Sequence, residues 1–292
     1  MSIRFVRGEI VWADARTVTD PHALEIIRKN NEKNYLHEIL FSTDLPKRIE
    51  LGDAIENNPY HFFFYMIARF YYFDDGVSDI HFYYPNKRGD YFSEAALKAL
   101  PPRFKRETEK YEGFEYIEMP GCLWYTDSIE EPWMFAYVRD LYKEIWKDVS
   151  PEKGKYTYIS RALGSKKTRR ILNEEDLYTP LKQVGFSAYT LETMTFEQQI
   201  RLFASSEIIT GPHGAGLAYL IFCKPGTPVC EINNGLVEKK GHYRDIAVKC
   251  GLRHYQFRNA PSAGGLEDMM VNVEEYKAVL EYLTGLGNSG WR

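Results

Sequence analysis

The sequence predicts an α/β protein made of two units of similar size. In both halves of the chain, short stretches rich in β-branched and aromatic residues alternate with longer amphipathic stretches. That alternation is typical of mostly parallel sheets covered by helices. Near the midpoint, the segment KDVSPEKGKYTYISR (147–161) combines charged residues with Pro151 and Gly154. Such a segment indicates a domain boundary, and we expect a cleft between the two units.

The composition excludes several classes of partner. The chain has 292 residues, 44% of them hydrophobic, and a formal net charge of −4, which gives no overall attraction to nucleic acid. The longest apolar stretch, HFFFYMIARFYYF, is interrupted by Arg69 and is too short to span a bilayer, and the N-terminus lacks the apolar core of a signal peptide. We therefore expect a cytoplasmic protein with no membrane span. The four cysteines lack metal-site spacing, so we expect no metal centre.

The first half contains three expected strands and three expected helices. Pro59 and Pro132 suit the first turn of a helix, where the missing N–H costs nothing. We expect strands at 8–13, 80–85 and 114–119, and helices at 59–73, 91–100 and 132–148.

The second half repeats this alternation with clearer helix ends. Thr195 and Gln198 form a capping box, and Asn272 and Gly285 suit the two ends of a last helix. We expect a further helix around 173–185, and strands at 155–160, 187–191, 206–210 and 227–232.

A glycine-rich turn, TGPHGAGLAYLIF (210–222), lies between an expected strand and an expected helix. Gly211, Gly214 and Gly216 would let backbone N–H groups at the helix start approach an anion closely. The spacing matches neither GxGxxG nor a Walker loop, so phosphate binding and a purely structural turn both remain open. At a helix N-terminus His213 is expected to be neutral and to donate one hydrogen bond to an oxyanion, although it could instead pack the turn.

Two further features lie at expected strand ends. Arg161 follows the strand at 155–160, and Lys166, Lys167, Arg169 and Arg170 continue a basic loop up to Asn173. This loop would either neutralise a diphosphate or be solvated. Glu231 ends the strand after the glycine turn, where it would accept both ribose hydroxyls or pair with an arginine.

Several of these stretches occur in one order over residues 157–235: ISR, RRILNEEDL and TFEQQIRLFASSEIITGPHGAGLAYLIFCKPGTPVCEI. Together they resemble glycosyltransferase family 61. The resemblance implies a GT-B architecture, in which two Rossmann-like domains face a cleft. It implies an N-terminal acceptor-binding domain (1–149), a nucleotide-sugar-binding domain (150–266) and a C-terminal helix (267–292) that packs back on the N-terminal domain.

The resemblance also implies inverting transfer from a UDP-sugar to a carbohydrate acceptor. UDP-xylose is the favoured donor, and UDP-N-acetylglucosamine or another UDP-sugar is possible. The chain would be a short soluble member of bacterial or large-virus type. The implied donor-binding residues are Arg161, Arg169, Arg170, Asn173, Gly211, His213, Gly214, Ala215, Gly216 and Glu231.

An inverting transfer needs a base that takes the proton of the acceptor hydroxyl. His61 is the leading candidate, because it lies near the N-terminus of its expected helix, beside Asn57 and Asn58, where a neutral imidazole is favoured. The stretch NPYHFFFYMIARF also resembles a family helix, with Asn58, His61 and Arg69 as its motif residues. A histidine that only packs this helix is the alternative. Asp14 and Asp127 follow strand-like stretches and are alternative bases. Because protein cations already face the diphosphate, we expect that no divalent metal is strictly required.

One departure supports a different function. The family helix carries an acidic residue where this chain has Tyr65. A catalytically inactive nucleotide-sugar-binding or scaffold protein is therefore the alternative, and it would be stabilised by UDP without turnover. A phosphotransferase that uses His213 as its nucleophile is less favoured, because no partner base is visible near it in the sequence.

Overall fold

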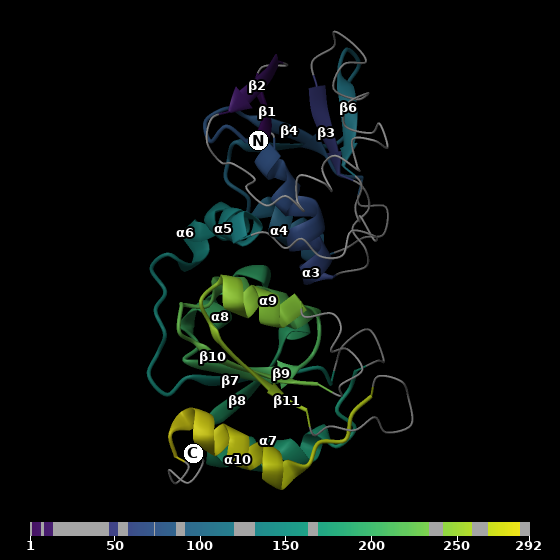
Figure 1. The fold of residues 1–292 in the computed structure, drawn as a ribbon. Helices are drawn as coiled ribbons and strands as arrows, with labels where there is room; N and C mark the ends of the chain where they lie inside the picture. The colour runs from purple at the N-terminus through teal and green to yellow at the C-terminus, as the bar shows by residue number, and fades with distance from the viewer. Residues whose placement is uncertain are drawn as a thin grey trace. The chain divides into compact units, whose positions relative to one another are not determined.

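The computed structural model divides the chain into two compact units, Met1–Leu141 and Tyr142–Arg292, each of which carries a parallel sheet (Figure 1). An α/β fold of this kind is what the sequence predicts. The residues that the structure describes are 2–6, 9–13, 47–51, 58–72, 74–85, 91–119, 132–162, 169–233, 242–258 and 268–286.

The second unit is built on a five-stranded parallel sheet in the order β11-β10-β9-β7-β8. From β7 the chain goes outward to β8, and it then returns across β7 to begin β9. The strand order therefore reverses between β7 and β9. At such a switch point the connections leave in opposite directions, which opens a crevice at the carboxyl ends of the two strands. The strands are β7 (Tyr156–Ser160), β8 (Phe186–Thr190), β9 (Ile208–Pro212), β10 (Pro228–Ile232) and β11 (Arg253–Phe257).

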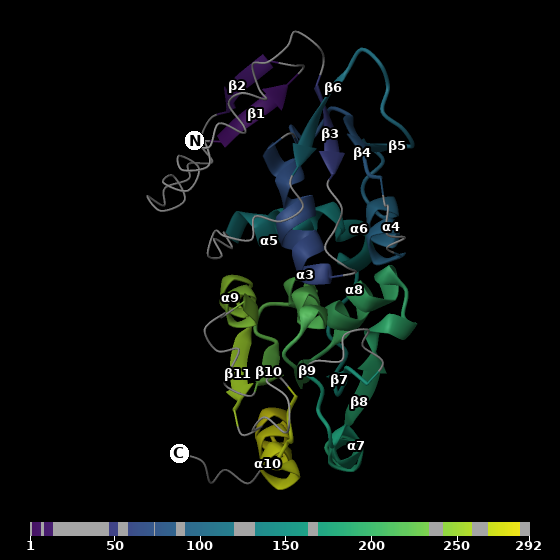
Figure 2. The ribbon, with the colours of Figure 1, turned by 90° about the vertical axis from the view of Figure 1, so that its right-hand side faces the viewer.

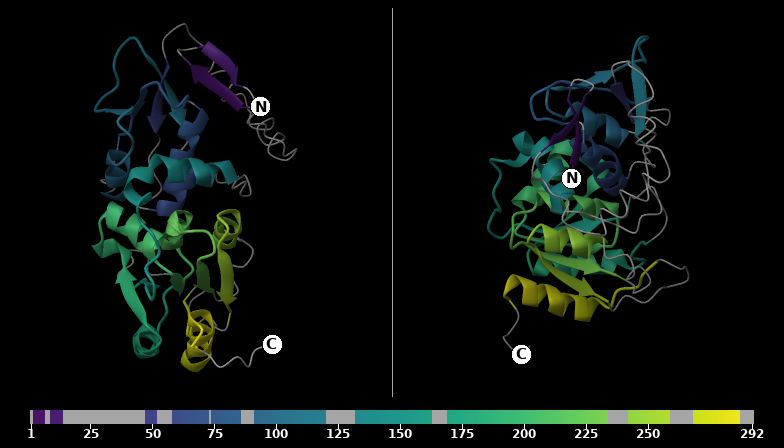
Figure 3. Two further views of the ribbon diagram at one scale, coloured as in Figure 1. Left: turned by 90° about the vertical axis from the view of Figure 1, so that its left-hand side faces the viewer. Right: turned by 45° about the horizontal axis from the view of Figure 1, so that its top comes forward.

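Helices cover both faces of this sheet, which gives three layers (Figures 2 and 3). On one face lie α7 (Glu174–Gln183) and α10 (Val273–Thr284). The other face carries α8 (Phe196–Ser205), the 3-10 helix η4 (Ala215–Phe222) and α9 (His242–Lys249). The short 3-10 helix η3 (Leu191–Thr193) links β8 to α8.

The last helix packs into the core of the second unit. Tyr276 and Leu280 of α10 are fully buried in a core that includes Leu177 of α7 and Tyr158 of β7, and the Tyr276 hydroxyl lies 2.7 Å from Thr210 Oγ1. The apolar face of this helix is thus used within the core of the second unit. Its ends are as predicted, because the side chain of Asn272 caps the first turn and Gly285 adopts the left-handed conformation.

The boundary between the units falls at 141/142, eight residues before the expected one. The helix expected at 132–148 is interrupted at Tyr142, where α5 (Pro132–Leu141) ends and α6 (Lys143–Trp146) begins. Tyr142 is buried against Phe196 and Phe222. Its ring therefore belongs to the core of the second unit.

The first unit contains a four-stranded parallel sheet in the order β5-β4-β3-β6, and a separate antiparallel pair, β1 and β2. The expected strand at 8–13 is β2, but it belongs to that pair. The strands are β1 (Ser2–Val6), β2 (Glu9–Ala13), β3 (Lys47–Leu51), β4 (Ile80–Tyr83), β5 (Phe104–Glu107) and β6 (Glu115–Met119). Strands β1, β3 and β5 were not predicted from the sequence.

The aromatic stretch 59–72 of the first unit is helical throughout, but its type of helix changes along the chain. It begins as α3 (Pro59–His61), continues as the π-helix η1 (Phe62–Met66) and ends as the 3-10 helix η2 (Ile67–Tyr72). Its phenylalanines pack against one another and against Phe82 of β4. The helix α4 (Tyr91–Lys98) adds Phe92 to this cluster. Among the described segments, no helix is both long and apolar enough to cross a bilayer.

Candidate functional site

Two predicted site segments meet at the switch point of the second unit. Arg161 follows the end of β7, and the glycine turn follows the end of β9. The Arg161 Nη1 group donates a hydrogen bond to the carbonyl oxygen of His213 at 3.2 Å. A Cβ atom on Gly214 would overlap this guanidinium group. Arg161 thus lies directly across Gly214, in space that only a glycine leaves open.

The other two glycines of the turn have packing roles. A Cβ atom on Gly211 would lie 2.8 Å from the backbone oxygen of Ile159 in β7, and one on Gly216 would lie 2.9 Å from Leu191 Cδ1. Gly211 therefore lets β9 and β7 approach closely. The structural reading of the turn thus applies to Gly211 and Gly216.

The helix after the turn is a 3-10 helix, and its first amides are available. Its first hydrogen bond runs from Leu217 N to Gly214 O at 2.8 Å. The N–H groups of Ala215 and Gly216 precede that bond, so the helix does not use them. They lie next to Arg161, which crosses the turn at Gly214. A cation and unused amide donors at one strand end form a site suited to an anion.

His213 and Glu231 are brought together, in a way that the sequence did not predict. His213 Nδ1 is hydrogen bonded to Glu231 Oε1, and His254 Nε2 lies 2.9 Å from Glu231 Oε2. Glu231 is 2% exposed and His213 is 5% exposed. Both carboxylate oxygens are therefore engaged by imidazoles. The sequence reading of Glu231, as an acceptor for ribose hydroxyls or as the partner of an arginine, did not include these histidines.

The same pairing indicates which tautomer a neutral His213 would adopt. An ionised carboxylate can only accept hydrogen bonds, so the Nδ1 proton of the neutral ring must be donated to Glu231. The neutral imidazole then carries a lone pair on Nε2 and cannot donate to an oxyanion. Burial lowers the pKa of His213, and the hydrogen bond and charge of Glu231 act in the opposite direction.

Arg169 approaches this cluster, but Arg170 and Asn173 are engaged elsewhere. The charge of Arg169 contributes to the lowered pKa of His213, so Arg169 lies near the ring. Arg170 forms an ion pair with Asp268, at 2.7 Å, and Asn173 exchanges two hydrogen bonds with the backbone of Val271. Arg170 and Asn173 therefore tie the start of α7 to the segment before α10, and their expected role at the diphosphate stays a prediction. The remaining basic residues, Lys166 and Lys167, lie outside the described residues.

The candidate bases lie in the first unit. His61 is half-buried in the first turn of its helix, and the Asn58 side chain accepts hydrogen bonds from the amides of Tyr60 and His61. This Asn58 cap holds the backbone of His61 at the helix start. Arg69 lies in η2. The alternative bases, Asp14 and Asp127, lie outside the described residues.

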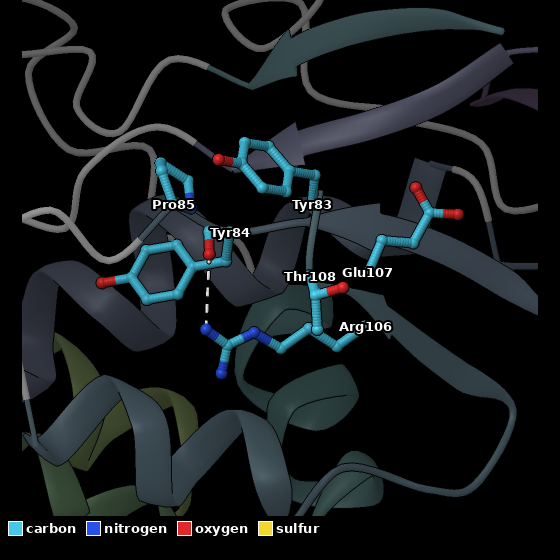
Figure 4. Close-up of a pocket in the computed structure, with 6 residues that line it drawn as sticks. All are labelled: Tyr83, Tyr84, Pro85, Arg106, Glu107 and Thr108. Carbon is cyan, nitrogen blue, oxygen red and sulfur yellow. Dashed lines mark hydrogen bonds between the residues drawn. The ribbon is translucent and has the colours of Figure 1, made fainter. Parts of the chain in front are cut away.

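A pocket opens at the carboxyl ends of β4 and β5 in the first unit (Figure 4). Its lining combines the rings of Tyr83 and Tyr84 with the guanidinium group of Arg106, which donates to the Tyr84 carbonyl oxygen at 3.3 Å. Aromatic rings beside charged groups suit the apolar faces and hydroxyls of a sugar. The remaining lining residues are Pro85, Glu107 and Thr108.

Sequence reasoning missed His254, because the strand that carries it was not predicted. The available signal is the alternation in RHYQF (253–257) after Gly251, which is typical of a strand that follows a turn. Within the described parts of the chain, no group of three or more His, Cys, Asp or Glu side chains is arranged to hold a metal ion.

In an open parallel sheet whose strand order reverses, ligands bind in the crevice at the carboxyl ends of the strands, and Arg161 and the glycine turn lie at such an end. The family model described as Glycosyltransferase 61 matches residues 60–230, which is more than half of the chain. The chain therefore belongs to glycosyltransferase family 61.

Known proteins of two kinds are similar to part of the chain. The EGF domain-specific O-linked N-acetylglucosamine transferase of Drosophila melanogaster is 31% identical over 106 residues, which are 35% of this chain and 19% of that protein. The protein of the same name from Gallus gallus is 33% identical over 95 residues, 31% of this chain and 17% of that protein. The β-1,2-xylosyltransferase of Arabidopsis thaliana is 29% identical over 140 residues, 43% of this chain and 24% of that protein. The matched segments thus span less than a quarter of these relatives.

Proposed function

We propose that this chain transfers a sugar from a UDP-sugar to a hydroxyl group of a glycan, by direct displacement with inversion at the anomeric carbon. The observation that carries the proposal is the position of Arg161 across Gly214, beside the amides of Ala215 and Gly216. These groups supply a charge and N–H donors at one strand end, where the two phosphates of a donor would bind.

In this reaction the acceptor oxygen attacks the anomeric carbon while the bond from that carbon to the diphosphate breaks. UDP leaves with the bonding electrons, and a base takes the proton of the acceptor hydroxyl. Negative charge therefore grows on the diphosphate in the transition state. Arg161 and the amides at the start of η4 would stabilise that charge, because they are held in place before the reaction begins.

The proposed donors are UDP-xylose and UDP-N-acetylglucosamine. The sequence resemblance favours UDP-xylose, and the names of the relatives include transferases for both sugars. The proposed acceptor-binding part is the first unit, with His61 as the base. Because Arg161 and the amides supply the diphosphate contacts, we propose that no divalent metal is obligatory, and activity should persist in excess chelator.

Release of UDP from the donor tests the proposed site. Purified protein incubated with UDP-xylose or UDP-N-acetylglucosamine, without acceptor, should release UDP slowly from one of them. Arg161→Ala removes a preorganised cation from the leaving group and should lower this rate by about 100-fold or more. Arg201→Ala, which removes an exposed arginine of α8, is the matched control and should keep the wild-type rate.

The outcomes separate the proposal from its alternative. Equal rates for Arg161→Ala and wild type would show that the leaving group is bound elsewhere. An increase in the melting temperature with UDP, without UDP release from any donor and without transfer to any glycan, would instead support a nucleotide-sugar-binding protein that does not catalyse.

A further inference from the structure

One carboxylate in the second unit is held between two buried histidines. Three adjacent parallel strands supply the groups: His213 follows β9, Glu231 lies in β10 and His254 lies in β11. The amide of His213 donates to the carbonyl of Ile232 at 2.9 Å, which continues the strand pairing and fixes the backbone of His213. The side chains of His213 and His254 are both 6% exposed.

The protons of this cluster can be assigned from its hydrogen bonds. Burial raises the pKa of Glu231, but the hydrogen bonds from His213 and His254 and the charges of the two rings have a larger opposite effect. The net result is a pKa lowered from 4.5 to about 2. Glu231 is therefore ionised and accepts from both imidazoles. His213 must donate from Nδ1 and His254 from Nε2. Among the described residues, Nε2 of His213 has no hydrogen-bond partner.

A bound diphosphate would repel the lone pair on Nε2 of a neutral His213. His213 directly precedes Gly214, across which Arg161 lies, so its ring belongs to the same strand end as the proposed phosphate site. Phosphate oxygens accept hydrogen bonds and carry negative charge, and they repel the lone pair of a neutral imidazole. An imidazolium donates from both nitrogens at once, one toward Glu231 and one toward the phosphate.

We propose that donor binding is coupled to the uptake of one proton by His213. The charge of Glu231 stabilises the protonated His213. His254 is a positioning residue that sets the pH range in which the proton is taken up. The inference rests on the proposed function, because it takes the diphosphate of a UDP-sugar as the ligand. The proton comes from solvent, binds to His213 Nε2 and is released when the nucleotide leaves.

His254 acts on His213 only through the shared carboxylate. Its hydrogen bond to Oε2 withdraws negative charge from Glu231. The hydrogen bond from His213 Nδ1 to Oε1 is then weaker, so the protonated ring is stabilised less. Without that bond the carboxylate is more basic, and His213 takes up its proton at higher pH. Loss of the Glu231 charge has the opposite effect, because a buried imidazolium without a counter-charge is unfavourable.

Other charged and titratable groups near His213 have to be separated from this effect. They are Arg161 after β7, Arg169 before α7, and His242 and Tyr243 at the start of α9. Both arginines keep their charge throughout the relevant range. Since His242 acts electrostatically on His213, it requires a control variant.

Calorimetric titration measures the coupling without relying on turnover. UDP-xylose and UDP-N-acetylglucosamine are titrated into the protein, without acceptor, between about pH 6 and pH 8 in buffers of different ionisation enthalpy. These nucleotide sugars are preferable to UDP, because a terminal phosphate itself titrates near about pH 6. The dependence of the observed heat on buffer gives the number of protons taken up.

Wild-type protein should take up as much as about one proton per donor bound. His213→Gln keeps an N–H donor but cannot ionise, so it should bind without proton uptake. His254→Leu removes the donor to Glu231 and should displace the uptake curve to higher pH, whereas His254→Gln keeps an N–H donor and should restore the wild-type curve. His242→Gln is the control and should leave the uptake unchanged.

The outcomes distinguish this inference from the function on which it rests. Donor binding without proton uptake by wild type, or equal uptake by His213→Gln, would overturn the coupling and leave the donor site intact. An unchanged curve for His254→Leu would remove the role of His254. If neither nucleotide sugar binds at any pH, both the proposed function and the coupling fail. If a variant does not fold, the wild-type uptake alone still decides whether the coupling exists.

Discussion

Gly214→Ala should weaken donor binding strongly while leaving the fold intact. The added methyl group would overlap the Arg161 guanidinium group, which is the mobile end of a flexible side chain and can move away. Gly214 has a φ of 173°, an extended conformation that alanine also adopts. Loss of a charge-assisted hydrogen bond costs about 1.5–3 kcal/mol, so the dissociation constant for the donor should rise about 10- to 100-fold. Calorimetric titration with a UDP-sugar measures the change.

Gly211→Ala is the matched control three residues away. Its methyl group would lie 2.8 Å from the backbone oxygen of Ile159, which cannot move without separating β7 from β9. The overpacking should lower the free energy of unfolding by about 1–3 kcal/mol. Thermal unfolding should therefore detect Gly211→Ala and barely detect Gly214→Ala. Normal donor affinity in folded Gly214→Ala would contradict the position that we give to Arg161.

Glu231→Leu should be the most destabilising single change in the cluster of His213, Glu231 and His254. The substitution keeps a similar volume but leaves two buried imidazole donors without an acceptor. An unsatisfied buried donor costs about 1–3 kcal/mol, so the free energy of unfolding should fall by about 2–5 kcal/mol. Urea unfolding measures the loss. Glu197→Gln, at an exposed position of α8, should change the stability by no more than about 0.5 kcal/mol.

The effect of Glu231→Leu should also depend on pH in a defined direction. The pKa of Glu231 is lowered from 4.5 to about 2 in the folded protein, mainly because the two histidine hydrogen bonds outweigh the effect of burial. A group with a lowered pKa stabilises the folded state above its unfolded pKa, and this contribution is lost as the pH falls through the folded value. The stability difference between wild type and Glu231→Leu should therefore be full above about pH 5 and shrink toward pH 2. A difference that does not change over this range would show that Glu231 is not the ionised partner of the histidines.

In the second unit, helix ends that depend on residues close together in the sequence were predicted correctly. The capping box at Thr195 and Gln198 and the two ends of the last helix are confirmed, because each depends on neighbours in the chain. The pairing of Arg161 with the glycine turn could be anticipated because parallel strands end at one edge of their sheet. The alternation of strands and helices likewise predicted the fold class.

Contacts between distant segments could not be predicted. Arg170 and Asp268 are 98 residues apart, and nothing in the basic loop indicates that a carboxylate neutralises one of its arginines. The tautomer of His213 depends on Glu231 in the neighbouring strand, and the charge on Glu231 depends on His254 in the strand beyond it. The short charged strands β3 and β5 give a weak periodic signal, so they were missed.

The central claim is that the diphosphate of a UDP-sugar binds at the carboxyl end of β7 and β9. A crystal of the protein soaked with UDP-xylose or UDP-N-acetylglucosamine tests it most directly. The account predicts electron density for two phosphates between the Arg161 guanidinium group and the amides of Ala215 and Gly216. Density for the nucleotide at another place, such as the pocket of Tyr83 and Arg106 in the first unit, would contradict it.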